Sequence, residues 1–151
     1  MPHEPVQILL AEDDAGHARL IMRNLSRVGL VNRIVHVSDG QHALDYIYRR
    51  GEHADRPIGA PLLAILDIKM PRIDGVEVLR QIKSDTALDA MPVIMLTTTD
   101  DPREVEKCYE LGCNVYITKP VEYGDFVEAI CRLGLFLQVV TVAKEKDSRK
   151  D

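Results

Sequence analysis

The stretch AILDIKMPRIDG, residues 64–75, decides how the rest of the chain is interpreted. It contains the end of an apolar run, Leu62–Leu66, whose length and composition are typical of a buried strand. The run stops directly on Asp67, and a second charged residue, Lys69, follows two positions later. A core strand that ends on a carboxylate needs an explanation, and the pattern of the other strands supplies one.

Short apolar runs recur along the chain, and each is followed by a stretch with helical spacing. The predicted strands are Val6–Ala11, Ile34–Val37, Leu62–Leu66, Val93–Leu96 and Val115–Ile117. Strands that are apolar throughout need cover on both faces, and the helices of β-α-β crossovers provide it. The sequence therefore predicts an α/β fold, a doubly wound five-stranded parallel sheet with helices on both faces.

Capping patterns predict where the helices begin. The expected starts are Asp14, the capping-box pattern Ser38–Gln41, the stretch Asp74–Glu77 and the pair Asp101–Pro102. Gly112 is expected to end the fourth helix. The fifth helix is marked by an apolar stripe of Phe126, Ile130, Leu133 and Leu137.

Length and charge exclude several classes of protein. The 151 residues suit one domain, and a composition of 28% charged and 46% hydrophobic residues is that of a globular protein. A net charge of -5 gives no basic field for a nucleic acid, so we expect no nucleic-acid partner. The acidic N-terminal stretch and the lack of a long apolar run predict a cytoplasmic protein without a membrane partner.

The cysteines and histidines suggest no metal site of their own. Cys108, Cys113 and Cys131 are an odd number without C-x-x-C spacing, which argues against a zinc site and against a disulfide framework. The five histidines are scattered without ligand pairing, so none of them is assigned a role.

Polar residues collect where the predicted strands end. The first strand runs into Glu12, Asp13 and Asp14, the third into Asp67, the fourth into Thr97, and the fifth into Thr118, Lys119 and Pro120. Each has an ordinary explanation when taken by itself, because an aspartate can cap a helix and a lysine is usually solvated. In a doubly wound sheet, however, the carboxyl ends of the strands meet at one edge, so these side chains are expected to share a crevice.

Such a crevice requires a cation. Two carboxylates about 4 Å apart repel each other by about 4 kcal/mol at an effective dielectric constant near 20, so Glu12, Asp13 and Asp67 need compensation. Hard oxygen ligands at a rim open to water suit Mg²⁺ better than zinc. Lys119 could hold an anion beside the metal. Together, a carboxylate, a hard cation, a lysine and a hydroxyl indicate phosphoryl transfer to the carboxylate.

With these motifs in place, residues 5–138 resemble the receiver domain of bacterial response regulators, a flavodoxin-like fold with strand order 2-1-3-4-5. The resemblance rests on the acidic pair Glu12–Asp13, on LDIKMPRIDG around Asp67, on Thr97 and on YITKP around Lys119. It implies that a histidine kinase or a small phosphodonor phosphorylates Asp67. The protein would then be no enzyme with an external substrate, although it would catalyse its own phosphorylation and slow dephosphorylation.

The resemblance also implies roles for single residues. Mg²⁺ would be held by Glu12, Asp13, Asp67 and the backbone carbonyl of Lys69, whose side chain faces the site and influences the lifetime of the phosphate. Thr97 would receive the phosphoryl oxygens and Lys119 would pair with them. Tyr116 would be the switch aromatic, which turns inward as Thr97 moves. Pro120 corresponds to a proline with a cis bond, and Thr98 departs from the family pattern, which has a smaller residue there.

The predicted domain organisation is a receiver domain, residues 1–138, followed by a C-terminal extension, residues 139–151. The apolar part of the extension could serve as a dimerisation arm or fold back on its own domain, and the charged tail is expected to be disordered. The long connection Arg49–Pro61 and the ending LGLFLQVVTV resemble stand-alone regulators of bacterial phytochrome kinases. We expect such a kinase as partner, and a homodimer through the fourth and fifth helices or through the extension.

Other classes of protein stay open at this point. A phosphatase of the haloacid-dehalogenase type would need a second aspartate where this chain has Lys69. A flavin carrier would need a phosphate-binding loop after the first strand, where Glu12, Asp13 and Asp14 would repel a phosphate. A receiver-like binding scaffold that is never phosphorylated, or a phosphate sink, would carry the same fold.

Overall fold

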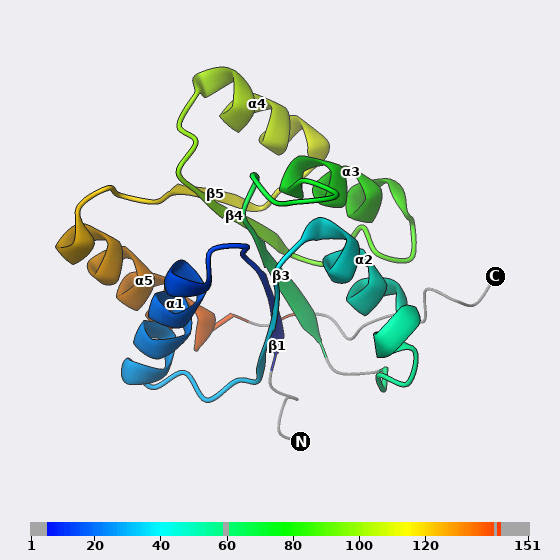
Figure 1. The fold of residues 1–151 in the computed structure, drawn as a ribbon, viewed down its shortest axis with the longest axis horizontal. Helices are drawn as coiled ribbons and strands as arrows, with labels where there is room; N and C mark the ends of the chain where they lie inside the picture. Colours follow the sequence, from blue (N-terminus) through cyan, green and yellow to red (C-terminus); the bar gives the residue numbers. More distant parts are fainter. Residues whose placement is uncertain (1–5, 59–60, 141, 143–151) are drawn as a thin grey trace.

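The computed structural model describes residues 6–58, 61–140 and 142. Its single sheet has five parallel strands in the order β2-β1-β3-β4-β5 (Figure 1). The strands are β1 Gln7–Ala11, β2 Ile34–Val37, β3 Leu62–Leu66, β4 Val93–Thr97 and β5 Val115–Thr118. The predicted α/β fold and strand order are confirmed, with strand boundaries that differ by one residue at most.

Helices fill the connections, and most begin where the capping pattern predicts. They are α1 Ala15–Arg27, α2 Gly40–Tyr48, the short 3₁₀ helix η1 Gly51–His53, α3 Gly75–Ser84, α4 Pro102–Leu111 and α5 Tyr123–Leu137. Asp14, Asp74 and Asp101 cap α1, α3 and α4 with their carboxylates, and Gly112 ends α4 with a φ of 107°.

The expected capping box of α2 is shifted by one residue. Asp39, not Ser38, is the N-cap, because its carboxylate accepts a hydrogen bond from the backbone N–H of His42 at 2.8 Å. Aspartate and serine are about equally good N-caps, so the sequence pattern could not separate the two neighbours. The shift leaves Asp39 nearly buried at the start of α2, where it meets the loop after β3.

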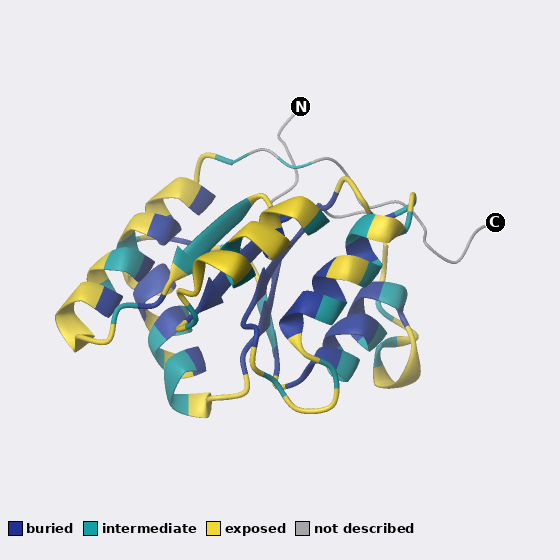
Figure 2. Ribbon diagram, turned by 90° about the horizontal axis from the view of Figure 1, so that it is seen from above, coloured by how far each residue is buried: buried dark blue, intermediate teal, exposed yellow. Residues whose placement is uncertain are grey.

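Two layers of helices cover the sheet (Figure 2). The strands divide their side chains between these two layers. Leu62, Ala64 and Leu66 of β3 pack with α2, α3 and α4, whereas Leu63 and Ile65 pack with α1 and α5. All five are at most 2% exposed. A central strand of this kind is fixed by packing on both faces. It therefore holds in place the residue that follows its C-terminal end.

The two edge strands, β2 and β5, are less covered than the three central strands. β5 lies next to β4. Val115, Tyr116 and Ile117 are each only half-buried, and Thr118 is exposed. Residues 34–36 of β2 are likewise only half-buried. The expectation that every strand is buried on both faces was therefore wrong for both edge strands, because an edge strand has a neighbour on one side only.

The C-terminal extension begins where α5 ends at Leu137. Val139 is 79% exposed, while Val140 and Val142 pack against the core layer formed by α1 and α5. This part of the extension folds back on its own domain, which was one of the two predicted arrangements. The charged tail lies outside the described residues. No helix of the described chain is both long enough and apolar enough to cross a membrane.

Candidate functional site

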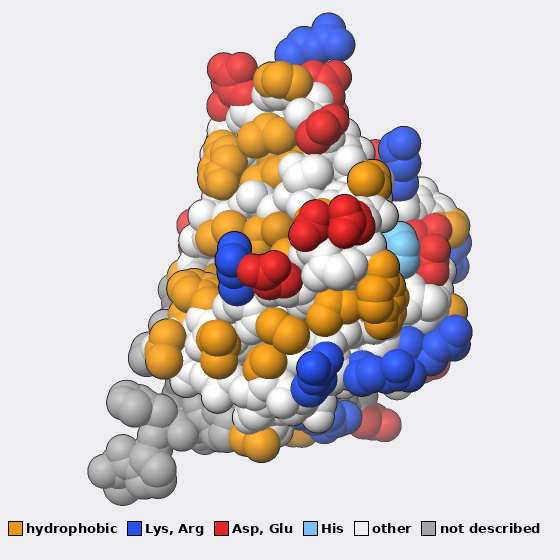
Figure 3. All heavy atoms as spheres, turned by 90° about the vertical axis from the view of Figure 1, so that its left-hand side faces the viewer, with side chains coloured by type: hydrophobic (Ala, Val, Ile, Leu, Met, Phe, Trp, Pro, Cys, Tyr) orange, Lys and Arg blue, Asp and Glu red, His pale blue; other side chains and the backbone are white. Residues whose placement is uncertain are grey.

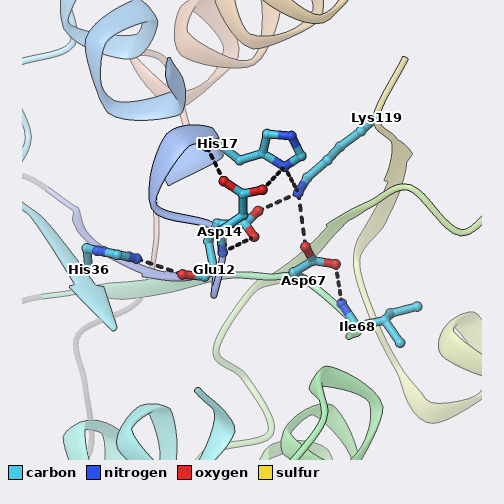
Figure 4. Close-up of polar contacts among 7 residues, drawn as sticks. All are labelled: Glu12, Asp14, His17, His36, Asp67, Ile68 and Lys119. Carbon is cyan, nitrogen blue, oxygen red and sulfur yellow. Dashed lines mark hydrogen bonds and ion pairs between the residues drawn. The ribbon is translucent and has the colours of Figure 1, made fainter. Parts of the chain in front are cut away.

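The carboxyl ends of β1, β3, β4 and β5 bring the predicted site residues to one corner of the sheet. Glu12 follows β1, Asp67 follows β3, Thr97 ends β4, and Lys119 follows β5. Three of these side chains meet directly, as Figure 4 shows. The parallel order of the strands thus assembles residues that are 107 positions apart in the sequence.

Lys119 occupies the centre of this corner and is only 3% exposed (Figure 4). Its ammonium donates to Glu12 Oε1 and to Asp67 Oδ2, the latter at 3.0 Å. Removing one partner from a buried group of this kind is costly, because the remaining charge has lost its hydration and would be left uncompensated. Lys119 thus supplies fixed positive charge where a phosphoryl group bound to Asp67 would lie.

The three predicted carboxylates form a cluster with the geometry of a cation site. Glu12, Asp13 and Asp67 each offer an oxygen, and these oxygens lie within 4.8 Å of one another. Glu12 is 2% exposed and Asp67 is 9% exposed, whereas Asp13 faces solvent. Such a site combines two fixed oxygens with an open side where water can complete the shell, which suits Mg²⁺.

Burial sets the protonation of Glu12. It raises the pKa of this carboxyl from 4.5 to about 7, although the ion pair with Lys119 opposes the rise and the nearby Asp67 adds to it. The second oxygen, Oε2, accepts from the backbone N–H of Asp14 at 3.1 Å, and His36 contacts the Glu12 carbonyl at 2.8 Å. Glu12 is therefore held in place while its charge remains incompletely compensated.

Asp67 is oriented from three sides. Its Oδ1 accepts from the N–H of Ile68 at 2.7 Å, and its own N–H donates to the carbonyl of Ala11 at 3.0 Å. Gly75, the first residue of α3, approaches so closely that a Cβ there would lie 2.0 Å from the Asp67 carbonyl oxygen. Only a glycine fits at that point, so the start of α3 is packed directly against the candidate acceptor.

Thr97 carries a hydroxyl that has no partner. The residue is fully buried, and its Oγ1 makes no hydrogen bond within the described residues. The following residue, Thr98, is exposed. An unsatisfied buried hydroxyl costs free energy, which makes it a candidate to bind an oxygen that arrives with a phosphoryl group.

Tyr116 connects β5 to the loop after β4. Its hydroxyl donates to the carbonyl of Thr99 at 2.6 Å, and burial raises its pKa to about 12. The backbone N–H of Tyr116 donates to the hydroxyl of Tyr109 in α4 at 3.0 Å. The predicted switch residue is thus bonded to the loop that follows Thr97.

His17 belongs to the site, although the sequence offered no reason to select it. It lies in the first turn of α1, and its Nδ1 is 3.2 Å from the Lys119 ammonium (Figure 4). Its ring also contacts Phe126 of α5, with centroids 5.6 Å apart. The structure therefore brings one of the histidines that were assigned no role into contact with the site.

Two expectations around the rim have different outcomes. Lys69 lies exposed in the loop after β3, so its backbone carbonyl as a metal ligand stays a prediction. No peptide bond between described residues is cis, so the Lys119–Pro120 bond is trans, contrary to the resemblance. The trans isomer is the more stable one by about 0.5–1 kcal/mol, and Lys119 reaches both carboxylates with it.

With this geometry, similarity to known proteins identifies the class. The family model for the response regulator receiver domain matches residues 8–131. The chain belongs to this family. The probable methanogenesis regulatory protein FilR2 of Methanothrix harundinacea is 39% identical, and the match covers 84% of this chain and 80% of FilR2. Response regulator Rcp1 of Synechocystis is 33% identical, with 91% and 93% covered.

Solved structures agree with this assignment. A receiver domain from Rhodospirillum rubrum superimposes with a TM-score of 0.85 at 43% identity, covering 93% of this chain and 99% of that one. The Mn²⁺-bound form of Rcp1 gives 0.84 at 32% identity, covering 91% and 98%. The phosphorylated cyanobacterial phytochrome response regulator RcpA gives 0.83 at 32% identity, covering 93% and 99%. The predicted resemblance to receiver domains, and among them to phytochrome regulators, is confirmed.

Proposed function

We propose that this protein is a single-domain response regulator that accepts a phosphoryl group on Asp67 from a histidine kinase and signals by protein–protein contact. The observation that carries the proposal is the buried corner in which the Lys119 ammonium holds both Asp67 and Glu12. The relatives Rcp1 and RcpA support it, since the first was solved with Mn²⁺ and the second in its phosphorylated form.

In the proposed reaction an Asp67 oxygen attacks the phosphorus of a phosphohistidine. The new bond is O–P, the broken bond is P–N, and the imidazole leaves with the electron pair and takes up a proton. Asp67 is suited to this because its hydrogen bonds to Ile68 and Lys119 fix the carboxylate at the end of a buried strand. Lys119 would then balance charge on the transferred group.

A divalent cation, Mg²⁺ in this proposal, would be held by Glu12, Asp13, Asp67 and the Lys69 carbonyl, and it would neutralise charge on the phosphoryl oxygens. Two features of the chain fit it. The carboxylate oxygens converge within 4.8 Å, and Glu12 and Asp67 share only one ammonium. A single positive charge cannot balance three carboxylates, so the cluster has capacity for a cation.

Phosphorylation would shift the protein between two arrangements. The phosphoryl group would give the hydroxyl of Thr97, which has no partner among the described residues, an acceptor, and it would add a further partner to Lys119. Movement of Thr97 would pull on the loop to which Tyr116 is bonded through Thr99. The conformational change would therefore reach α4, α5 and the edge strand β5.

The partner we propose is a phytochrome-type histidine kinase in the cytoplasm. The names of RcpA and of the bacteriophytochrome response regulator RtBRR, which is 42% identical, support this choice. The side of the molecule that carries α5 displays many hydrophobic side chains (Figure 3). Tyr109, Tyr123, Leu135 and Phe136 are each about half exposed or more. A homodimer through α4 and α5, or through the extension 139–151 that follows the receiver domain 1–138, would cover them.

Intact mass after incubation with Mg²⁺ and acetyl phosphate or phosphoramidate tests the proposal. The protein should gain one phosphoryl group, and a chelator should prevent the gain. Asp67→Asn should abolish it. Asp14→Asn is the matched control, because Asp14 is an exposed carboxylate that caps α1 and asparagine caps equally well.

The alternatives predict different results. No mass gain with small donors or with histidine kinases would favour a binding scaffold. A phosphate sink would gain the mass but show no change in self-association or in affinity for the kinase. Mass gained equally by Asp67→Asn would place the acceptor elsewhere and contradict the assignment.

A further inference from the structure

The loop between β3 and α3 contains a residue in an unusual conformation. Arg72 has a φ of 67°, in the left-handed region that residues other than glycine seldom adopt. It lies five residues beyond Asp67 and three beyond Lys69. A conformation of this kind persists only when surrounding contacts hold it, so the contacts of Arg72 must stabilise the left-handed backbone.

Those contacts are made with α2. The Arg72 guanidinium donates to both carboxylate oxygens of Asp39, from Nε to Oδ2 at 3.1 Å and from Nη2 to Oδ1 at 3.2 Å. A two-bond pair fixes the orientation of both groups as well as their distance. Arg72 thus joins the loop after the candidate acceptor to the N-cap of α2, which lies 33 residues earlier in the sequence.

Asp39 is a rigid partner for this pair. It is 9% exposed, and as N-cap of α2 it also accepts from the N–H of His42 at 2.8 Å. Burial raises its pKa, but the hydrogen bonds from His42 and Arg72 outweigh burial and hold the pKa below its usual value. Because the carboxylate is fixed by its own helix, little freedom remains to be lost when Arg72 binds it.

Backbone packing brings the same two segments together. A Cβ on Gly40, the first residue of α2, would lie 1.9 Å from the carbonyl oxygen of Ile73. The two ends of the loop between β3 and α3 are also joined to each other, because Gly75 N–H donates to the Ile68 carbonyl at 2.8 Å. The exposed middle of the loop, which includes Lys69, therefore has its contact with α2 at Arg72 and Ile73.

We propose that the Asp39–Arg72 pair is a positioning device, which holds the loop between β3 and α3 so that the Lys69 carbonyl is in place for the divalent cation. This inference rests on the proposed function, because it assigns a task to residues outside the site. Asp39 and Arg72 are not among the residues that we propose to hold the metal or the phosphoryl group. They act through the backbone, as partners of ligands do in other metal sites.

An exposed ion pair usually contributes little to stability. A second arginine–carboxylate pair in the same protein serves as a control for the Asp39–Arg72 pair. Arg80 of α3 also binds a carboxylate with two bonds, that of Glu77. Its side chain is 53% exposed and that of Arg72 is 52% exposed. The Arg80 pair lies within one helix and joins no two segments, so its loss should leave the cation site unchanged.

The experiment measures Mg²⁺ affinity by calorimetry and the free energy of unfolding in urea, for wild type, Arg72→Ala, Asp39→Asn and the control Arg80→Ala. Asparagine retains the cap of α2 while it removes the charge. We expect the Mg²⁺ dissociation constant to rise about tenfold in Arg72→Ala and Asp39→Asn, and to stay within about twofold in Arg80→Ala. At saturating Mg²⁺, phosphorylation by phosphoramidate should recover its wild-type rate.

Arg72→Gly separates the ion pair from the backbone, since glycine adopts a positive φ without cost. It should lose Mg²⁺ affinity as Arg72→Ala does. Recovery of wild-type affinity in Arg72→Gly would show that backbone conformation, not the pair, was responsible, and would overturn the inference. If the wild type binds Mg²⁺ and is phosphorylated, unchanged Mg²⁺ affinity in both Arg72→Ala and Asp39→Asn would overturn this inference but not the proposed function. A wild type that binds no Mg²⁺ would instead overturn the proposed function.

Discussion

β3 and β5 each deliver a residue to the site, but they are built differently. β3 is central, with every residue buried, and Asp67 directly follows it. β5 is one of the two edge strands, half-buried up to its exposed last residue, yet it leads into the nearly buried Lys119. The candidate acceptor is thus held by the core, whereas Tyr116 lies on an edge strand, where a change of conformation would lose less packing.

Paired core substitutions test this contrast most strongly. Ile65 of β3 and Ile117 of β5 pack against the same cluster, the former fully buried and the latter partly. Ile65→Ala should lower the free energy of unfolding by about 3–5 kcal/mol, and Ile117→Ala by less than half of that, because less contact is lost at the edge. Urea denaturation measures both. Equal losses would mean that β5 is as firmly packed as β3.

The contact between the two strand ends should have the next largest effect. In Lys119→Met the carboxylates of Glu12 and Asp67 lose their shared ammonium. We expect the free energy of unfolding at pH 8 to fall by about 3 kcal/mol in the absence of divalent ions, and Mg²⁺ to restore part of it. Lys107→Met, at an exposed lysine of α4, should change stability by less than about 0.5 kcal/mol. A loss that Mg²⁺ does not reduce would argue against a cation site here.

The pH dependence of Mg²⁺ binding shows what burial at the end of a central strand does to a carboxylate. Glu12 titrates at about 7, above its ordinary 4.5, so it is protonated below pH 7 and ionised above it. Mg²⁺ affinity should be constant above pH 7 and fall about tenfold per pH unit below it. Without metal, the raised pKa means that Glu12 favours the folded state at low pH, and this contribution is lost as pH rises from 4.5 to about 7.

Calorimetric titration between pH 5.5 and 8.5 checks this prediction. Glu12→Gln should bind weakly at every pH and lose the step near pH 7. Affinity that stays constant down to about pH 5 would mean that the Glu12 carboxyl titrates normally and is not affected by its burial.

The smallest effect is expected at the hydroxyl of Tyr116. Tyr116→Phe removes the hydrogen bond to Thr99, which should lower the free energy of unfolding by about 1 kcal/mol. Hydrogen exchange should become faster in residues 98–101 and remain unchanged in β3. Faster exchange in β3 as well would remove the distinction between a fixed central strand and a responsive edge.

The strand order and most of the corner could be predicted because they depend on local patterns. Apolar runs locate the strands, and the residue after each run is by necessity at the carboxyl edge of a parallel sheet. Glu12, Asp67, Thr97 and Lys119 lie where these rules place them. Their proximity follows from the topology of the sheet, and the order of strands and helices along the sequence indicates that topology.

What could not be predicted depends on side chains that meet across separate elements. His17 reaches Lys119 because α1 turns one face toward the end of β5, and no spacing in the sequence reports that direction. The pair between Asp39 and Arg72 depends on a left-handed residue in a loop. The half-buried state of β5 follows from its place at the edge, which the apolar run Val115–Ile117 does not reveal.

The bond between Tyr109 and Tyr116 has a consequence for solubility. A sheet edge presents free backbone donors and acceptors, and another strand can pair with them and begin an aggregate. At Tyr116 of the edge strand, the backbone N–H is already occupied by a hydroxyl from α4. The side chain of one helix thus occupies a backbone donor with which a second chain could otherwise pair at this edge of the sheet.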